Sequence, residues 1–124
     1  MSGSLAARAA VEALRKVTSS FDGAEERQGQ IDMSAAIAES LASGRSIIVQ
    51  AGTGTGKSLG YLVPALLNGK KTVVATATKT LQDQLNRNDL PLLAQHLGID
   101  FTWAVIKGRS NYICKQRVNE LSDK

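Results

Sequence analysis

Apolar residues recur at helical spacing through the first part of the chain. Two stretches carry this pattern, residues 4–17 and about 28–41, and each is expected to form an amphipathic helix. Their apolar positions are Leu5, Val11, Leu14 and Val17 in the first and Ile31, Ala35, Ala38 and Leu41 in the second. The pair Ser43 and Gly44 then predicts a helix end, because glycine readily adopts a left-handed backbone.

Three short runs rich in β-branched residues follow, and each predicts a buried strand. They are residues 47–49, 72–76 and 101–106. Helices are expected between them: one over residues 57–67, one capped by Thr78, and one that ends at Gly98. This alternation of strand and helix predicts an α/β fold, a parallel sheet flanked by helices.

The composition indicates one soluble globular domain. Of 124 residues, 43% are hydrophobic and 21% are charged. No run approaches the roughly 18–20 apolar residues that a bilayer span needs, and no secretory signal is recognisable. We therefore expect a cytoplasmic location without a membrane partner. The single cysteine, Cys114, excludes an internal disulfide and fits a reducing compartment.

The positive charge is concentrated in the second half of the chain. The net charge of +4 divides into −1 over residues 1–56 and +5 over residues 57–124. A basic half suits a polyanionic partner such as nucleic acid. An ordinary solvated surface is the other interpretation.

A glycine-rich turn comes directly after the first predicted strand. It has the P-loop spacing A-x-x-x-x-G-K-S, with the members Ala51, Gly52, Thr53, Gly54, Thr55, Gly56, Lys57 and Ser58. Glycines let successive backbone N–H groups converge on an anion, and the helix that follows directs its positive end to the same place. Lys57 would contact the β- and γ-phosphates, and Ser58 would offer a hydroxyl to Mg²⁺. A Gly-Thr turn that matches by chance is the alternative, but its place between a strand and a helix favours phosphate binding.

Arg27 and Gln30 precede this P-loop by about 20 residues on the second predicted helix. A glutamine amide donates and accepts at once, which matches the N6 and N7 edge of adenine. A solvated helix residue is an equally good interpretation of Gln30.

Four blocks of the sequence together resemble the DinG/XPD group of superfamily-two helicases, on its bacterial DinG-like side. They are ERQGQIDM, IIVQAGTGTGKSLGYLVPAL, TVVATATKTLQDQL and VIKGRSNYIC, and the likeness covers roughly residues 25–117. The resemblance implies a partial RecA-like P-loop NTPase domain, as the amino-terminal segment of an ATP-dependent 5′–3′ DNA helicase acting in DNA repair or replication.

The resemblance also implies roles for individual residues. Arg27 and Gln30 would form the adenine motif, and residues 51–58 would bind ATP with Mg²⁺. Contacts to single-stranded DNA would come from Thr76, Thr78, Lys79 and Gln82, although a helix cap alone also explains Thr78.

Cys114 corresponds in this family to the first of four cysteines that ligate a [4Fe–4S] cluster. One thiolate cannot hold such a cluster, so an idle or small buried thiol is the better interpretation in this chain. A basic segment with an aromatic residue surrounds it, compatible with DNA contact and equally with a plain surface: Arg109, Tyr112, Lys115 and Arg117.

No Walker B acid pair follows the P-loop, so the expected domain is truncated before that motif. We expect an N-terminal helix and loop over residues 1–24, the first part of a motor domain over 25–107, and the start of an iron–sulfur-type insertion over 108–124. Helicase activity is expected of a full-length parent and is left open for these 124 residues, as is the oligomeric state. A stand-alone nucleotide- or DNA-binding module without turnover is the alternative. A small-molecule kinase is disfavoured, because the adenine motif and the 76–82 block would then be coincidences.

Overall fold

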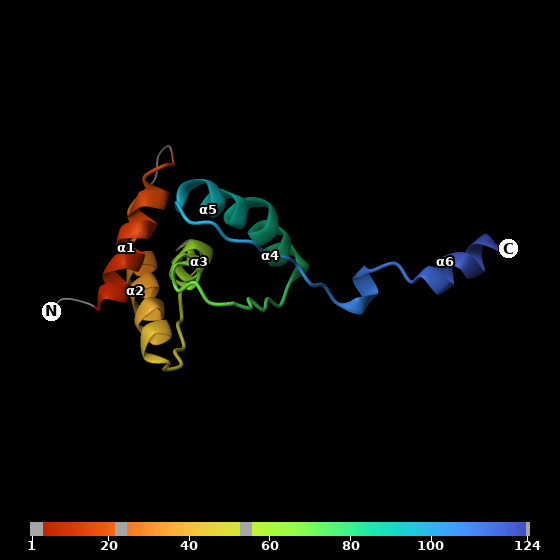
Figure 1. Ribbon diagram of the computed structural model, residues 1–124, viewed down its shortest axis with the longest axis horizontal. Coiled ribbons are helices and arrows are strands. Elements are labelled where there is room, and N and C mark those ends of the chain that lie inside the picture. Colours follow the sequence, from red (N-terminus) through yellow and green to blue (C-terminus); the bar gives the residue numbers. More distant parts are fainter. Residues whose placement is uncertain (1–3, 22–24, 53–55, 124) are drawn as a thin grey trace.

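The computed structural model describes residues 4–21, 25–52 and 56–123, and all regular structure in these ranges is helical. The elements are α1 (Leu5–Thr18), α2 (Gln28–Ser43), α3 (Lys57–Leu67), α4 (Lys79–Gln84), the π-helical turn η1 (Leu85–Asp89), α5 (Leu90–His96), the 3₁₀ turn η2 (Arg109–Asn111) and α6 (Lys115–Ser122). Helices α1, α2 and α3 pack against one another, and the rod formed by α4, η1 and α5 lies beside them (Figure 1). Helix α6 lies at the far end of an extended arm.

Helices α1 and α2 confirm the two helices predicted from apolar spacing. The hydroxyl of Ser4 caps α1 by accepting a hydrogen bond from the Ala7 N–H at 3.1 Å. Gly44 ends α2 with a left-handed backbone, φ +74°, as predicted. Leu14 and Val17 lie on the buried face of α1, whereas Leu5 is 83% exposed and does not belong to that face.

The hydrophobic core lies where these helices meet. Its buried members come from α1, α2, α3, η1 and the α5 end of the rod: Leu14, Val17, Ile31, Leu62, Val63, Leu85, Leu93 and Leu97. The core is therefore formed by helix packing against helix, and its fully buried members are all aliphatic.

The predicted α/β fold, with its parallel RecA-like sheet, is wrong. No strand occurs in the part of the chain that the structure describes, and the three runs expected to be buried strands are irregular. Ile48, Val73 and Ile106 within them are 98%, 86% and 84% exposed. β-Branched residues give only a local preference, because a strand is stable only when its backbone pairs with a neighbour.

The third run shows what replaces strand pairing. The Trp103 indole N–H donates to the Asn86 side-chain oxygen at 2.9 Å, and the Phe101 and Trp103 rings lie 5.6 Å apart. The segment therefore lies along the rod of α4, η1 and α5 through side-chain contacts with a helix.

The rod itself differs from the prediction of two separate helices. It runs without a break from Lys79 to His96, and only the turn η1 is widened to π geometry. Pro91 explains the widening, because proline lacks an N–H and its ring clashes with the carbonyl four residues earlier, at Arg87 within η1. The irregular turn is thus a local consequence of one proline.

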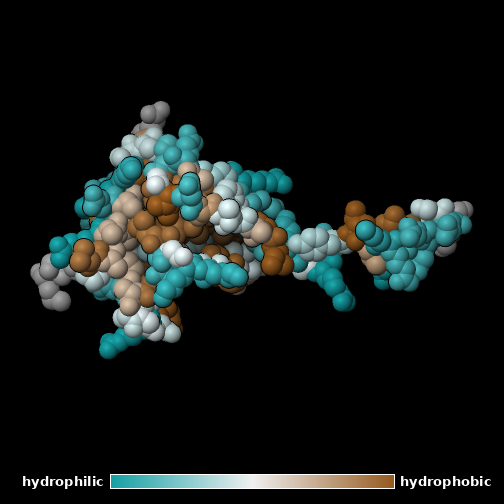
Figure 2. Space-filling model, viewed as in Figure 1, coloured by the Kyte–Doolittle hydropathy of each residue, from teal (hydrophilic) through white to brown (hydrophobic). Residues whose placement is uncertain are grey.

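Apolar side chains remain at the surface, over the helical body and on the arm (Figure 2). Ile113, at 82% exposed, is an example from the arm. None of the helices within residues 4–21, 25–52 and 56–123 has both the length and the hydropathy that a bilayer crossing requires.

Ser34 generates a stability prediction. Its side chain is fully buried in α2, and its hydroxyl has no hydrogen-bond partner among the described residues. Replacing it by alanine removes an unpaired polar group, so Ser34→Ala should raise the free energy of unfolding by about 1 kcal/mol in urea titrations. Ser40→Ala is the matched control and should lower it, because the Ser40 hydroxyl donates to the Arg45 carbonyl beyond α2. A loss of stability in Ser34→Ala would contradict this account.

Candidate nucleotide-binding site

The predicted P-loop ends at the start of α3. Gly56 is the N-cap residue with a left-handed backbone, φ +70°, and Lys57 is the first helical residue. Gly56, as the N-cap residue, has no side chain to accept from the first N–H groups of this helix, which point to the place where an anion is expected. Lys57 is exposed, Ala51 is half-buried and Gly52 is exposed. The predicted members Thr53, Gly54 and Thr55 lie outside the described residues.

Gln30 holds the last glycine of this loop. Its side chain is 4% exposed, and its amide N–H donates to the Gly56 carbonyl at 2.9 Å. The interpretation of Gln30 as a solvated helix residue is therefore wrong. Arg27, exposed at the N-cap of α2, has a guanidinium nitrogen 3.7 Å from the point where a Gly56 Cβ would stand. The structure thus brings both predicted adenine-motif residues to the P-loop.

Helices α2 and α3 approach each other closely at two glycines. A Cβ on Gly56 would lie 2.2 Å from the Gln30 amide nitrogen, and one on Gly60 would lie 2.2 Å from the Met33 methyl. The Gln30–Gly56 contact and the Met33–Gly60 contact lie about one helical turn apart on both helices. The two helices therefore touch along one side over at least one turn. The first turn of α3 is thereby fixed against α2.

Ser58, the predicted Mg²⁺ ligand, lies beside a carboxylate that sequence reasoning missed. Ser58 is half-buried, and its hydroxyl lies near enough to Tyr61 and Asp89 to lower the pKa of each. Asp89 belongs to η1, and the Gln84 amide also donates to it at 3.4 Å. No spacing rule singles out Asp89, and the nearest sequence signal is Pro91, a residue that disturbs helix geometry.

Burial and hydrogen bonding act in opposite directions on these groups. Burial raises the pKa of Asp89 above its ordinary value, although hydrogen bonds from Gln84 and Ser58 lower it in part. Burial also raises the pKa of the Tyr61 phenol; the hydrogen bond with Ser58 lowers it and the charge of Asp89 raises it. The carboxylate beside Ser58 therefore carries an electrostatic cost that a cation would relieve.

The predicted nucleic-acid residues lie around the start of α4. The Thr78 hydroxyl accepts from the Leu81 N–H at 3.2 Å, which confirms that Thr78 caps the helix. Accepting this bond leaves its own hydrogen for another acceptor. Thr76 donates to the Thr78 carbonyl at 3.0 Å, and Lys79 is exposed. The Gln82 amide donates to the Ile106 carbonyl at 3.3 Å, so one donor of that side chain is engaged within the protein.

Cys114 is an exposed free thiol just before α6. The described residues contain no group of three or more His, Cys, Asp or Glu side chains that could hold a metal ion. The residues present do not fit a [4Fe–4S] cluster, which needs four ligands where this chain has one cysteine. The basic residues of the arm, from Arg109 to Arg117, are all exposed.

The close approach at Gly56 predicts a specific sensitivity to substitution. Gly56→Ala places a methyl group against the Gln30 amide and imposes a left-handed backbone on alanine, which costs about 1–2 kcal/mol from the backbone alone. A drop in thermal unfolding temperature is expected. Gly69→Ala is the matched control and should lower it less, because Gly69 has the same left-handed backbone, φ +70°, and its Cβ would meet no described atom within 4 Å. Equal effects of the two substitutions would contradict the proposed packing.

The raised pKa of Asp89 leads to a prediction: the stability difference between Asp89→Asn and the wild type should depend on pH. Because its pKa is raised in the folded state, its charged form destabilises the fold once the pH exceeds the ordinary carboxyl pKa. Asp89→Asn should therefore be more stable than the wild type at pH 7.5, and the difference should shrink as the pH falls towards 4. Asp100→Asn, which removes an exposed carboxylate, should show little effect in the same urea titrations. The stability of Asp89→Asn is compared with that of the wild type at each pH. If the variant's advantage were smaller at pH 7.5 than at pH 4, this reasoning would be refuted.

Comparison with known proteins assigns the chain to a family. The model of the DEAD/DEAH box helicase family matches residues 31–123. The chain is 39% identical to the ATP-dependent DNA helicase YoaA of Haemophilus influenzae over 106 residues, which are 86% of this chain and 17% of that protein. It is 44% identical to the ATP-dependent helicase DinG of Mycobacterium tuberculosis over 105 residues, covering 78% of this chain and 16% of DinG. The DinG of Photobacterium profundum is 41% identical, covering 74% and 15%.

No solved structure matches the chain. The chain spans about a sixth of the length of these relatives, and the match covers most of the chain itself. The resemblance inferred from the four sequence blocks is therefore confirmed, and this chain belongs to the DEAD/DEAH box helicase family, with relatives named DinG and YoaA.

Proposed function

We propose that this chain binds ATP and Mg²⁺ at the P-loop, as one segment of an ATP-dependent DNA helicase. The observation that carries the proposal is the junction at Gly56, where the buried Gln30 amide fixes the start of a helix whose N-cap glycine offers no side-chain acceptor. The first N–H groups and the positive end of the helix favour a phosphate at this place. Lys57, exposed on the first turn, adds an ammonium for the β- and γ-phosphates.

Ser58 and Asp89 are suited to the Mg²⁺ ion. Mg²⁺ prefers hard oxygen ligands, and a hydroxyl and a carboxylate lie together here. When bound, the ion supplies positive charge to the phosphate oxygens. Burial raises the pKa of Asp89, and the charge of the ion would lower it again, because a neighbouring cation favours the ionised carboxylate.

Arg27 and Gln30 are proposed to recognise the adenine. One Gln30 N–H already holds Gly56, so its second N–H and its carbonyl oxygen are the groups for the base edge. The planar Arg27 guanidinium suits stacking on an aromatic base. Their position next to the P-loop supports a joint site for base and phosphates.

Single-stranded DNA is the proposed macromolecular partner. Thr78, Lys79 and Gln82 offer a hydroxyl, an ammonium and one remaining amide N–H to phosphate oxygens, and Thr76, which donates to the Thr78 carbonyl, holds the backbone beside them. The relatives are named as DNA helicases, and the chain covers a sixth of their length. In the whole protein we propose 5′–3′ unwinding in DNA repair or replication, in the cytoplasm.

Binding without turnover is the second candidate function. It is favoured by one observation: the groups that the structure brings to the start of α3, Gln30, Lys57 and Ser58, are suited to binding a base, phosphates and Mg²⁺. Turnover also needs a group that orients the attacking water, and binding alone does not. A measurable rate of ATP hydrolysis by this polypeptide, stimulated by single-stranded DNA, would exclude this second candidate.

Lys57→Ala tests nucleotide binding directly. Loss of a charge-assisted hydrogen bond to phosphate, worth about 1.5–3 kcal/mol, should weaken ATP binding at least about tenfold in titration calorimetry. Lys71→Ala is the control, since it removes the same exposed charge from the irregular segment after α3. Unchanged ATP affinity in Lys57→Ala would remove the proposal.

A further inference from the structure

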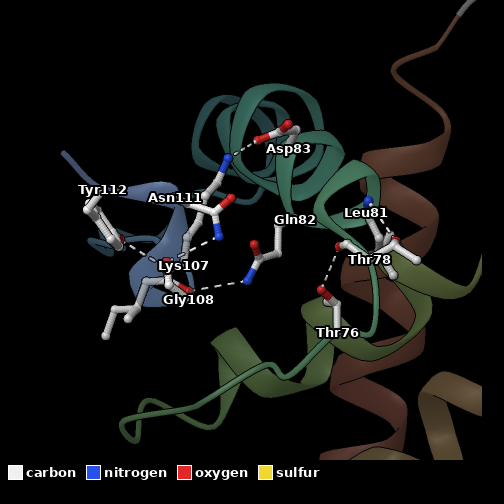
Figure 3. A network of polar contacts seen from close by, with 10 residues as sticks. Thr76, Thr78, Leu81, Gln82, Asp83, Lys107, Gly108, Asn111 and Tyr112 are labelled. Carbon is white, nitrogen blue, oxygen red and sulfur yellow. Dashed lines mark hydrogen bonds and ion pairs between the residues drawn. The ribbon is translucent and has the colours of Figure 1, made fainter. Parts of the chain in front are cut away.

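A network of polar contacts ties the rod to a segment more than twenty residues later in the chain (Figure 3). The Lys107 ammonium pairs with the Asp83 carboxylate of α4 at 3.0 Å. The neighbouring Gln82 amide donates to the Ile106 carbonyl at 3.3 Å. Two successive residues of α4 thus hold two successive residues of the later segment.

The contacts of Gln82 with Ile106 and of Asp83 with Lys107 form an anchor, and the residues that follow it are folded into a turn. The Lys107 N–H donates to the Tyr112 hydroxyl at 2.9 Å, which closes the chain over residues 107–112. Within it, both the backbone N–H and the side-chain amide of Asn111 donate to the Gly108 carbonyl, at 2.9 and 3.1 Å. Holding Lys107 therefore holds this whole turn, including η2.

Lys107 is also the last point at which the arm is partly buried. Its side chain is 30% exposed, whereas every described residue after it is classed as exposed. The basic residues Arg109, Lys115 and Arg117 all follow this point. Their placement relative to α4 therefore depends on the contacts made at Ile106 and Lys107.

The charge of Asp83 needs an explanation in a basic region. A carboxylate beside a surface for DNA repels phosphate unless it serves the protein itself. Here its charge is used internally: the hydrogen bond from Lys107 lowers the pKa of Asp83, with further lowering by the charges of Lys107 and Arg87. Asp83 therefore stays ionised at neutral pH and paired with Lys107.

We propose that Asp83 is a positioning residue for single-stranded DNA: by holding Lys107, it fixes where the basic arm leaves α4, so that one strand can contact both the start of α4 and the arm. This inference rests on the proposed function, because it presupposes DNA binding at the start of α4. An exposed ion pair alone contributes little. Here it acts together with the Gln82 and Tyr112 hydrogen bonds, so an effect of a few-fold is expected.

Asp83→Asn separates positioning from simple charge repulsion, because the two predict opposite signs. Removing a negative charge near DNA should tighten binding if Asp83 only repels phosphate. If Asp83 positions the arm, binding of a fluorescent single-stranded oligonucleotide should weaken about threefold in anisotropy titrations, as expected for loss of one ion pair. Asp83→Glu should restore most of the affinity, since it keeps the charge. Asp100→Asn, with the same loss of charge at another exposed site, should not weaken binding.

Limited trypsin digestion without DNA reports on the anchor separately. Cleavage after Lys107 and Arg109 should be faster in Asp83→Asn than in the wild type, and Asp83→Glu should be protected again. Unchanged or tighter DNA binding in Asp83→Asn overturns the positioning role. Failure of the wild type to bind single-stranded DNA overturns the proposed DNA contact and the role of Asp83 in it, even if the digestion supports the anchor.

Discussion

The contact between α2 and the first turn of α3 determines where Arg27, Gln30, Lys57 and Ser58 lie relative to one another. Gln30 reaches the Gly56 carbonyl at 2.9 Å because neither Gly56 nor Gly60 has a side chain that would push α2 away. Close packing of this kind is rigid, since a shift of one helix needs a shift of the other. The bond therefore places Lys57 and Ser58 on a fixed turn, with Arg27 at the same end of α2.

A second constraint comes from Pro91 in the rod. The π turn that accommodates it carries Asp89 to Ser58 and Asn86 to the Trp103 indole. Irregular turns of this type are frequent at functional sites, because they direct side chains that a regular helix would turn elsewhere. One backbone irregularity thus joins the P-loop serine on one side and the segment leading to the arm on the other. The same rod, through Asp83, holds the basic arm itself.

Local signals in the sequence were sufficient for helices and insufficient for strands. The Ser4 cap was not foreseen, but the Gly44 stop and the Thr78 cap act within a few residues and were predicted correctly. The strands were wrong because pairing depends on distant partners, and Ile48 and Val73 are exposed in the structure. The P-loop prediction depends only on the spacing of residues 51–58, whereas the placement of Asp89 and the Asp83–Lys107 pair depends on residues 31 and 24 positions away, which no local pattern encodes.

The central claim is that backbone N–H groups at the start of α3 receive the phosphates of ATP. Backbone amide chemical shifts during a titration with Mg²⁺ and ATP test it most directly. The account predicts saturable shifts for the amides of Gly56, Lys57 and Ser58, with those of the segment 101–106 unchanged. Shifts confined to the basic arm, or no saturable change at Gly56, Lys57 and Ser58, would contradict it.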